Sequence, residues 1–393
     1  MSWILLRGGH VFDPEDRGVA DVLILDGRIL AVGAALPAPT GIGEGTVHDA
    51  RDRIVLPGLI DGHIHAMGAS GMGGPATRST DLQIDRITSA GVTTAISPLG
   101  ADSLSRAIPA LLARAAALDA EGITALCYTG GWWHPVPTLT GNPQADVTFV
   151  DRIVGIKVAL SEPLAPACSP DDLCRLAHAA YAGGRLAGKN AVLHAHIGDR
   201  PEGLTPLLEV QRRTGIPADR LVATHVNRNP DLWQQALEYA RAGGSIDLTA
   251  MQRPETRHPK AIHPAKAIRE ALAAGVTPGR LTLSSDSGAA YPRLDPTGRE
   301  VGQYMAGPDC LLEVMRELVR GGLTWGQAAA FTTRHVADLL GLRRKGRVAP
   351  GVDADLLLLT PAGEVDRVYC RGRLMMEGGT PIVRGPFDGH AAA

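Results

Sequence analysis

The sequence lacks several features that mark particular classes of protein. None of its apolar runs approaches the ~18 residues of a membrane-spanning helix, and the apolar stretch near Met1 is too short for the core of a signal peptide. The 39 Lys and Arg residues nearly balance the 41 Asp and Glu residues, so we expect neither a nucleic-acid nor a membrane partner. The five cysteines are scattered and show no C-x-x-C spacing. This pattern predicts a reduced cytoplasmic protein with structural thiols.

What the sequence does contain is typical of a globular protein with many turns. Its 393 residues are enough for one large barrel and a smaller unit. Hydrophobic residues make up 45% of the chain and charged residues 20%, which are ordinary proportions. The 47 glycines and 28 prolines predict many turns between short elements.

The two ends of the sequence are expected to be rich in strands. Near the start, the strand-like stretches Asp21–Leu25 and Arg28–Val32 flank an Asp-Gly pair, which is typical of a type I′ hairpin. Near the end, Ala354–Leu359 and Glu364–Tyr369 have the same character. Both ends therefore resemble parts of one β-domain.

These patterns predict two domains. We expect residues 1–54 and 346–393 to form a small, discontinuous β-sandwich domain. Residues 55–345 would form the larger domain between its two parts. The tail after Pro386 is expected to fray, because chain ends are poorly ordered unless they are held down.

The middle of the chain alternates between short apolar strands and helical segments. Seven strand-like stretches follow the one that begins at Ile54, namely Val92–Ser97, Ile123–Tyr128, Val154–Leu160, Val192–Ile197, Leu221–Val226, Ile246–Thr249 and Leu281–Ser284. Helical segments between them include Ser103–Leu118, Asp171–Ala182, Asp231–Ala242 and Pro264–Ala274. Eight such units predict an α/β fold of the (β/α)8 TIM-barrel type. The alternative is an open doubly wound sheet, but no G-x-G-x-x-G motif follows the first strand.

The stretch Val55–His65 contains the first candidate metal ligands. His63 and His65 are two residues apart at the end of an apolar run. Residues at i and i+2 of a strand share a face, so the two imidazoles are expected to lie close together. Imidazole nitrogens suit zinc and similar divalent metals. Alone, a His-x-His pair is weak evidence, because most such pairs are not ligands.

Further polar residues end other predicted strands. They are Lys157 in the fourth strand, His194 and His196 in the fifth, His225 in the sixth and Asp286 in the eighth. Each has an ordinary alternative: a core histidine, a paired or Schiff-base lysine, or an aspartate that caps a helix. In a barrel, however, the carboxyl ends of the strands meet at one mouth, where active sites lie. The set therefore predicts one metal-binding active site.

This constellation resembles the amidohydrolase superfamily, and most closely the isoaspartyl (β-aspartyl) dipeptidases. The resemblance covers nearly the whole chain. The similar strings lie at residues 57–65, 90–94, 155–159, 196–199, 224–229, 283–286 and 350–358. It implies a hydrolase with a binuclear centre of zinc or another divalent metal, a small-molecule amide substrate and a homo-oligomeric state.

The resemblance also implies a role for each ligand. His63 and His65 would hold one metal, His196 and His225 the other, and a carboxylated Lys157 would bridge both beside a bridging hydroxide. Asp286 would bind the first metal and act as general base and then general acid. His194 is expected in the core or behind the ligands. Two divalent cations would disfavour an ammonium, so Lys157 should lose its proton, and CO2 can then convert the amine into an anionic ligand.

The substrate side departs from the dipeptidases. The Gly-rich loop at 68–74, which contains Ser70, has Met72 where they are expected to carry the glutamate that holds the substrate amino group. Four other family positions, a tyrosine, an arginine, a threonine and a serine, are matched by Trp132, Leu164, Ala101 and Ala290. Five departures beside a complete ligand set suggest the same chemistry on a different substrate.

Two further features of the substrate side leave alternatives open. Arg228 is a candidate clamp for a substrate carboxylate, and the alternative is that it pairs with a protein carboxylate. The segment at 251–263 is charged and rich in proline; it is either a lid whose Arg253, Arg257 or His258 meets the ligand, or a solvated loop.

Three functions are therefore weighed. The first is hydrolysis of a linear amide, either an isoaspartyl peptide or an N-acylated or modified amino acid. The second is ring opening of a cyclic amide, as in dihydroorotases and hydantoinases. The third is a non-catalytic assembly protein, which the complete ligand set disfavours.

Overall fold

Eight parallel strands form the central sheet and follow one another in chain order. The computed structural model describes residues 2–69, 73–256, 259–295, 297 and 299–386. The strands of the central sheet are β6 (Leu59–Asp61), β7 (Val92–Ser97), β8 (Thr124–Gly130), β9 (Ile153–Leu160), β10 (Val192–Ile197), β11 (Leu221–Thr224), β12 (Ser245–Thr249) and β13 (Leu281–Ser284). Most of their residues are buried, as expected of parallel strands with helices outside.

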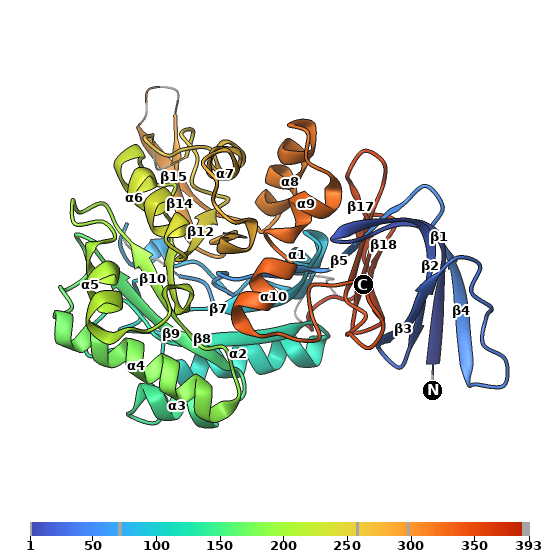
Figure 1. Cartoon of the computed structure of the whole chain (residues 1–393), viewed down its shortest axis with the longest axis horizontal. Helices are drawn as coiled ribbons and strands as arrows, with labels where there is room; N and C mark the ends of the chain where they lie inside the picture. The colour runs from blue at the N-terminus through green and yellow to red at the C-terminus, as the bar shows by residue number, and fades with distance from the viewer. Residues whose placement is uncertain (1, 70–72, 257–258, 296, 298, 387–393) are drawn as a thin grey trace.

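The sheet curves into a nearly closed barrel. Backbone hydrogen bonds join the segments that follow its first and last strands: His65 N donates to Ser287 O at 2.7 Å, and Asp286 N donates to His63 O at 2.9 Å. Helices cover the outside (Figure 1). The helices are α1 (Ile84–Ser89), α2 (Ile108–Glu121), α3 (Pro143–Phe149), α4 (Pro170–Ala187), α5 (Thr205–Thr214), α6 (Pro230–Arg241), α7 (Pro264–Ala273), α8 (Cys310–Arg320), α9 (Trp325–Ala330) and α10 (Arg334–Leu340). The predicted TIM barrel is confirmed.

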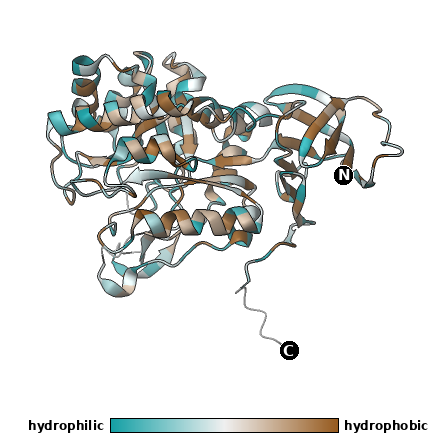
Figure 2. Cartoon of the chain, turned by 90° about the horizontal axis from the view of Figure 1, so that it is seen from below, coloured by the Kyte–Doolittle hydropathy of each residue, from teal (hydrophilic) through white to brown (hydrophobic). Residues whose placement is uncertain are grey.

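The two ends of the chain share a second, nine-stranded sheet beside the barrel (Figure 1, Figure 2). Its strands are β1 (Ser2–Asp13), β2 (Glu15–Leu25), β3 (Arg28–Gly33), β4 (Glu44–Asp49), β5 (Ile54–Pro57), β16 (Leu356–Leu359), β17 (Val365–Cys370), β18 (Arg373–Glu377) and β19 (Thr380–Pro381). An apolar cluster of its own combines residues from both ends, for example Val22, Val55 and Leu358. The β2–β3 turn has φ of 45° at Asp26 and 79° at Gly27, as the predicted type I′ hairpin requires.

One strand lies in a different sheet from the one expected. Val55 and Leu56 were expected to begin the barrel domain, but they belong to β5, which pairs with β1 and β16 in the terminal sheet. The Pro57-Gly58 pair separates it from β6. A Cβ at residue 58 would lie 2.3 Å from Thr93 Oγ1, so the close passage of the chain here requires glycine. A single apolar run therefore serves two sheets, and hydrophobicity alone does not reveal the break.

Two other elements also differ from expectation. Helix α2 begins at Ile108 rather than Ser103, because Pro109 favours a helix start and residues 101–106 form turns. A hairpin of β14 (Ala290–Leu294) and β15 (Glu300–Met305) follows the barrel's last strand and was not predicted. None of the described helices is both long and apolar enough to cross a membrane.

A buried ion-pair cluster connects the barrel to the terminal sheet. Lys345 Nζ lies 2.6 Å from Asp355 Oδ2, 2.9 Å from Asp353 Oδ2 and 2.8 Å from Thr124 Oγ1 of β8. Burial alone lowers the pKa of Lys345, but attraction to the two carboxylates outweighs it and raises the pKa overall. The ammonium therefore stays charged inside the protein.

We expect Lys345→Met to destabilise the fold strongly, because it removes the buried cation from Asp355 and leaves Asp353 only the exposed Arg344, at 3.5 Å. The expected loss is about 3–5 kcal/mol in the free energy of unfolding, measured by urea unfolding followed by circular dichroism. Lys266→Met is the matched control, since Lys266 is 64% exposed in its pair with Glu270; it should change stability by less than about 1 kcal/mol. Equal stability of the two variants would contradict the role of the cluster.

Candidate metal centre and active site

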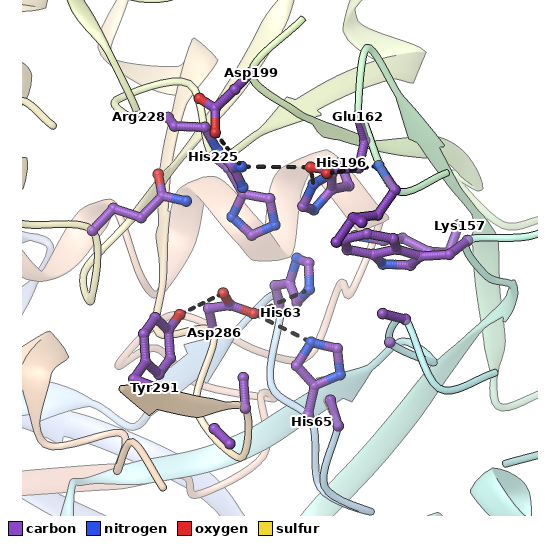
Figure 3. A pocket seen from close by; sticks show the side chains of 18 of the residues that line it. His63, His65, Lys157, Glu162, His196, Asp199, His225, Arg228, Asp286 and Tyr291 are labelled. Atoms are coloured by element: carbon purple, nitrogen blue, oxygen red, sulfur yellow. Dashed lines mark hydrogen bonds and ion pairs between the residues drawn. The ribbon is translucent and has the colours of Figure 1, made fainter. Parts of the chain in front are cut away.

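A cavity of about 370 Å³ opens at the carboxyl ends of the barrel strands (Figure 3). Every candidate metal ligand predicted from the sequence lines it. These are His63, His65, Lys157, His196, His225 and Asp286. Lys157 lies within β9, and the others lie at or just after the ends of four further strands, which is where barrel enzymes carry their catalytic residues.

The imidazoles form a compact cluster. Ring centroids lie 5.1 Å apart for His63 and His65, 4.9 Å for His63 and His225, and 4.6 Å for His196 and His225. One nitrogen or oxygen from each of His63, His225 and Asp286 lies within 4.8 Å of the others, so this group could hold a metal ion. Burial is the main cause that lowers the pKa of His63 and of His225 well below the ordinary value, which keeps both rings neutral and able to bind metal.

Neighbouring groups orient two of these rings. His194 lies behind the cavity, where its Nε2 is 3.0 Å from His63 Nδ1 and its ring stacks on Tyr128. His225 Nδ1 lies 2.6 Å from Thr249 Oγ1. His63 and His225 both use Nδ1 in these contacts, so the Nε2 atom of each is left for a metal. A second group that could hold an ion joins His63 and His194 to Asp247, deeper in the barrel.

Lys157 is buried among these histidines without a compensating contact. Within the described residues its Nζ has no hydrogen-bond partner. Burial lowers the pKa of Lys157 to about 7, so much of this amine is uncharged at neutral pH. An amine without a hydrogen-bond partner, beside four imidazoles and the Asp286 carboxylate, has the chemistry of a metal-binding site.

Asp286 faces both histidines of the first pair. Its Oδ1 lies 3.2 Å from His65 Nε2 and 3.6 Å from His63 Nε2, and its Oδ2 accepts a 2.7 Å hydrogen bond from the Tyr291 hydroxyl (Figure 3). Burial raises the pKa of Asp286, but the bonds from His65 and Tyr291 lower it more, so the group is a carboxylate. The backbone at Asp286 has φ of 58°, a left-handed conformation that Asp and Asn tolerate better than most residues.

Arg228 sits between two carboxylates that the sequence did not single out. Its Nη1 lies 3.5 Å from Glu162 Oε2 and 3.3 Å from Asp199 Oδ2 (Figure 3). Glu162 Oε2 also lies 3.1 Å from His196 Nε2. Arg228 therefore pairs with protein carboxylates in this structure, which was the alternative to its role as a clamp for a substrate carboxylate. Its Nε is still buried without a partner in the described part of the chain, so some binding capacity remains.

The predicted substrate-side positions also converge on the cavity. Ala101, Trp132, Leu164 and Ala290 all line it. The Trp132 ring lies 4.5 Å from the His196 ring, whereas Leu164 is 54% exposed at the rim. Ser70 and Met72 lie outside the described residues.

Other lining residues were missed from the sequence. Tyr291 belongs to the unpredicted hairpin, and Glu162 and Asp199 follow their strands in irregular segments. The 251–263 segment contributes Gln252 to the lining rather than Arg253, whose Nη1 pairs with Glu313 at 2.9 Å. Arg257 and His258 lie outside the described residues. Only proximity to a predicted strand end could have pointed to Glu162 or Asp199.

Comparisons with known proteins place the whole chain in one family. A family model described as the amidohydrolase family matches residues 240–375. The crystal structure of a beta-aspartyl dipeptidase from Fervidobacterium islandicum AW-1, in complex with beta-Asp-Leu dipeptide, superimposes with a TM-score of 0.87; it is 31% identical and covers 96% of this chain and 98% of its own. The chain belongs to the amidohydrolase superfamily. The predicted superfamily is confirmed, and membership supports the predicted enzyme class, a metal-dependent hydrolase.

Relatives of lower sequence identity are named for other reactions. Adenine deaminase of Deinococcus radiodurans is 27% identical over 378 residues, covering 91% of this chain and 58% of the relative. The chain thus spans little more than half the length of that curated relative. A dihydropyrimidinase from Brevibacillus agri NCHU1002 is 19% identical, with a TM-score of 0.69 and coverage of 97% of this chain and 96% of its own, which indicates a shared fold alone.

Proposed function

We propose that this member of the amidohydrolase superfamily is a binuclear metalloenzyme that hydrolyses a linear amide bond. The observation that carries the proposal is the orphaned amine of Lys157 among the candidate ligands of one cavity. In a protein interior such an amine costs free energy unless a ligand or a modification compensates it. We further propose a homo-oligomeric, cytoplasmic enzyme.

The donor set suits two divalent ions, with zinc favoured by the imidazoles. His63 and His65 would hold one ion and His196 and His225 the other. Reaction of the neutral Lys157 amine with CO2 would form an N–C bond and release a proton, and the resulting carbamate would offer the ions an anionic oxygen ligand. When bound, the metals would polarise the scissile carbonyl and make a water nucleophilic at neutral pH.

Asp286 is proposed to move the proton. Its Oδ2 is held by the Tyr291 hydroxyl, so its Oδ1 is directed toward His63 and His65. From there the carboxylate would accept a proton from the attacking water and pass it to the leaving nitrogen as the C–N bond breaks. Tyr291 acts as a positioning residue in this step because its hydroxyl fixes one carboxylate oxygen.

The proposed substrate carries an uncharged nitrogen, as in an N-acylated amino acid. Ala101, Trp132 and Leu164 in the cavity wall carry no charge that could neutralise a substrate ammonium. The carboxylates of Glu162 and Asp199 are already engaged by Arg228. The unused Nε of Arg228 supports its proposed role as a clamp for a substrate carboxylate.

Protein prepared with zinc and bicarbonate is expected to hold about two ions per chain, determined by elemental analysis after desalting. Lys157→Met should hold about one ion or fewer, because the anionic ligand between the two positions is lost. Lys266→Met, which removes an exposed lysine, should match the wild type. A single ion in the wild-type protein, or an unmodified Lys157 in its crystal structure, would refute the binuclear centre.

Asp286→Asn is expected to lower kcat by about 10²-fold or more, because the proton shuttle is lost. Asn tolerates the left-handed backbone at this position, so the fold should persist and most of the metal should remain. Steady-state kinetics and metal analysis on the same preparation check both points. Asp309→Asn, at an exposed carboxylate, is the control. An Asp286→Asn enzyme with near wild-type kcat would remove Asp286 from the mechanism.

The enzyme is expected to hydrolyse β-aspartyl-leucine with a kcat/KM about 10²-fold or more below that of its N-acetyl derivative. Burying an ammonium without a partner costs several kcal/mol, and each 1.4 kcal/mol is about tenfold in kcat/KM. The measurement is kcat/KM for both compounds on zinc-loaded protein, with hydantoin and dihydroorotate as tests of the ring-opening alternative. Faster hydrolysis of the free-amine dipeptide would show that the cavity recognises an ammonium after all.

A further inference from the structure

The 251–263 segment contributes to the cavity wall a side-chain amide whose oxygen has no hydrogen-bond partner among the described residues. Gln252 follows β12, lines the cavity and is 1% exposed. Its side-chain Oε1 is buried, and no hydrogen bond reaches this atom from the described residues. Such a buried acceptor costs free energy in the free protein unless a ligand pairs with it.

Hydrogen bonds anchor the main chain at Gln252 beside the cavity. Gln252 N donates to Thr249 O at 3.1 Å. The amide of the buried Asn227, two residues beyond His225, donates to Gln252 O at 3.1 Å and to Ile262 O at 3.1 Å. Both ends of the 251–263 segment are therefore tied to the strand end that carries a candidate metal ligand. The main chain at Gln252 is thus anchored, and its buried side chain is kept in the cavity wall.

Gln252 shares its cavity with two other orphaned polar atoms. Lys157 Nζ and Arg228 Nε are the others with no partner in the described part of the chain. Lys157 is assigned to the metals and Arg228 to a substrate carboxylate. The amide of Gln252 is the third of these groups, and the roles proposed so far do not use it. Unlike the other two side chains, it is uncharged.

We propose that Gln252 is a specificity-determining residue that hydrogen bonds the acylated nitrogen group of the substrate. A primary amide offers both a donor and an acceptor, and rotation of the amide exchanges them, so it matches the N–H or the C=O of an acyl group. It carries no charge with which to offset a buried ammonium. This inference rests on the proposed function and names the residue that selects its substrate class.

Two substitutions test the role of Gln252. In Gln252→Leu, kcat/KM for N-acetyl-β-aspartyl-leucine should fall about tenfold or more, whereas that for the free-amine dipeptide should change less than about threefold, because only the acyl group loses a hydrogen bond. In Gln252→Glu, the ratio of the two kcat/KM values should shift toward the free amine by about 10²-fold, because a carboxylate now faces the nitrogen. Gln211→Leu, in α5 away from the cavity, should leave the ratio unchanged.

The ratio of the two substrates separates recognition from stability, since partial unfolding lowers both kcat/KM values equally. An unchanged ratio in both Gln252 variants would overturn the inference. A wild-type enzyme that prefers the free amine would contradict the proposed substrate. A ratio that still shifts in Gln252→Glu would nevertheless uphold Gln252 as the selecting residue.

If turnover is too slow, calorimetry on the zinc-loaded protein can compare its affinities for N-acetylaspartate and aspartate. Their ratio should shift in the same direction in Gln252→Glu, and an unchanged ratio would again overturn the inference.

Discussion

The buried carboxylate of Asp61 joins the first and last strands of the barrel where the active site begins. Its Oδ1 accepts hydrogen bonds from His63 N at 3.3 Å and Ser285 N at 3.1 Å, and its Oδ2 accepts one from the Ser285 hydroxyl. Burial raises the pKa of Asp61 to about 7 even though these bonds act in the opposite direction. Together with the backbone bonds from His65 to Ser287 and from Asp286 to His63, these contacts close the barrel and set His63 opposite Asp286.

A second buried carboxylate has a similar role in the last strands of the barrel. Asp247 of β12 accepts hydrogen bonds from Thr224, Thr282 and Ser284, at 2.7, 2.7 and 2.6 Å. These residues come from the two neighbouring strands, and Thr224 directly precedes His225. These hydrogen bonds, which lie just below the active-site cavity, fix the strand ends that carry the candidate ligands. Apolar packing would not provide such directional contacts. The backbone at His225 is left-handed, with φ of 69°.

The strand ends of the barrel could be predicted because their signal is local. The strands at Val92–Ser97, Val192–Ile197 and Leu281–Ser284 have the expected bounds, and each candidate ligand lies beside an apolar run that marks it. Tyr291 and Gln252 could not be predicted in the same way. They reach the cavity from segments whose course depends on tertiary contacts such as those of Asn227. The change of sheet at Pro57-Gly58 was not predicted because both halves of the run are apolar, and hydrophobicity does not tell which sheet buries them.

The position of β5 has a consequence for synthesis on the ribosome. In the nine-stranded sheet β5 lies between β1, made shortly before it, and β16, made about 300 residues later. Every strand of the barrel emerges during that interval. Until Leu356–Leu359 leave the ribosome, the edge of β5 that will pair with them is open, and Val55 and Leu56 have no partner on that side. A strand with an open apolar edge is a site for wrong pairing. The nascent chain therefore carries an open strand edge directly before the segment that leads to its first metal-ligand candidates.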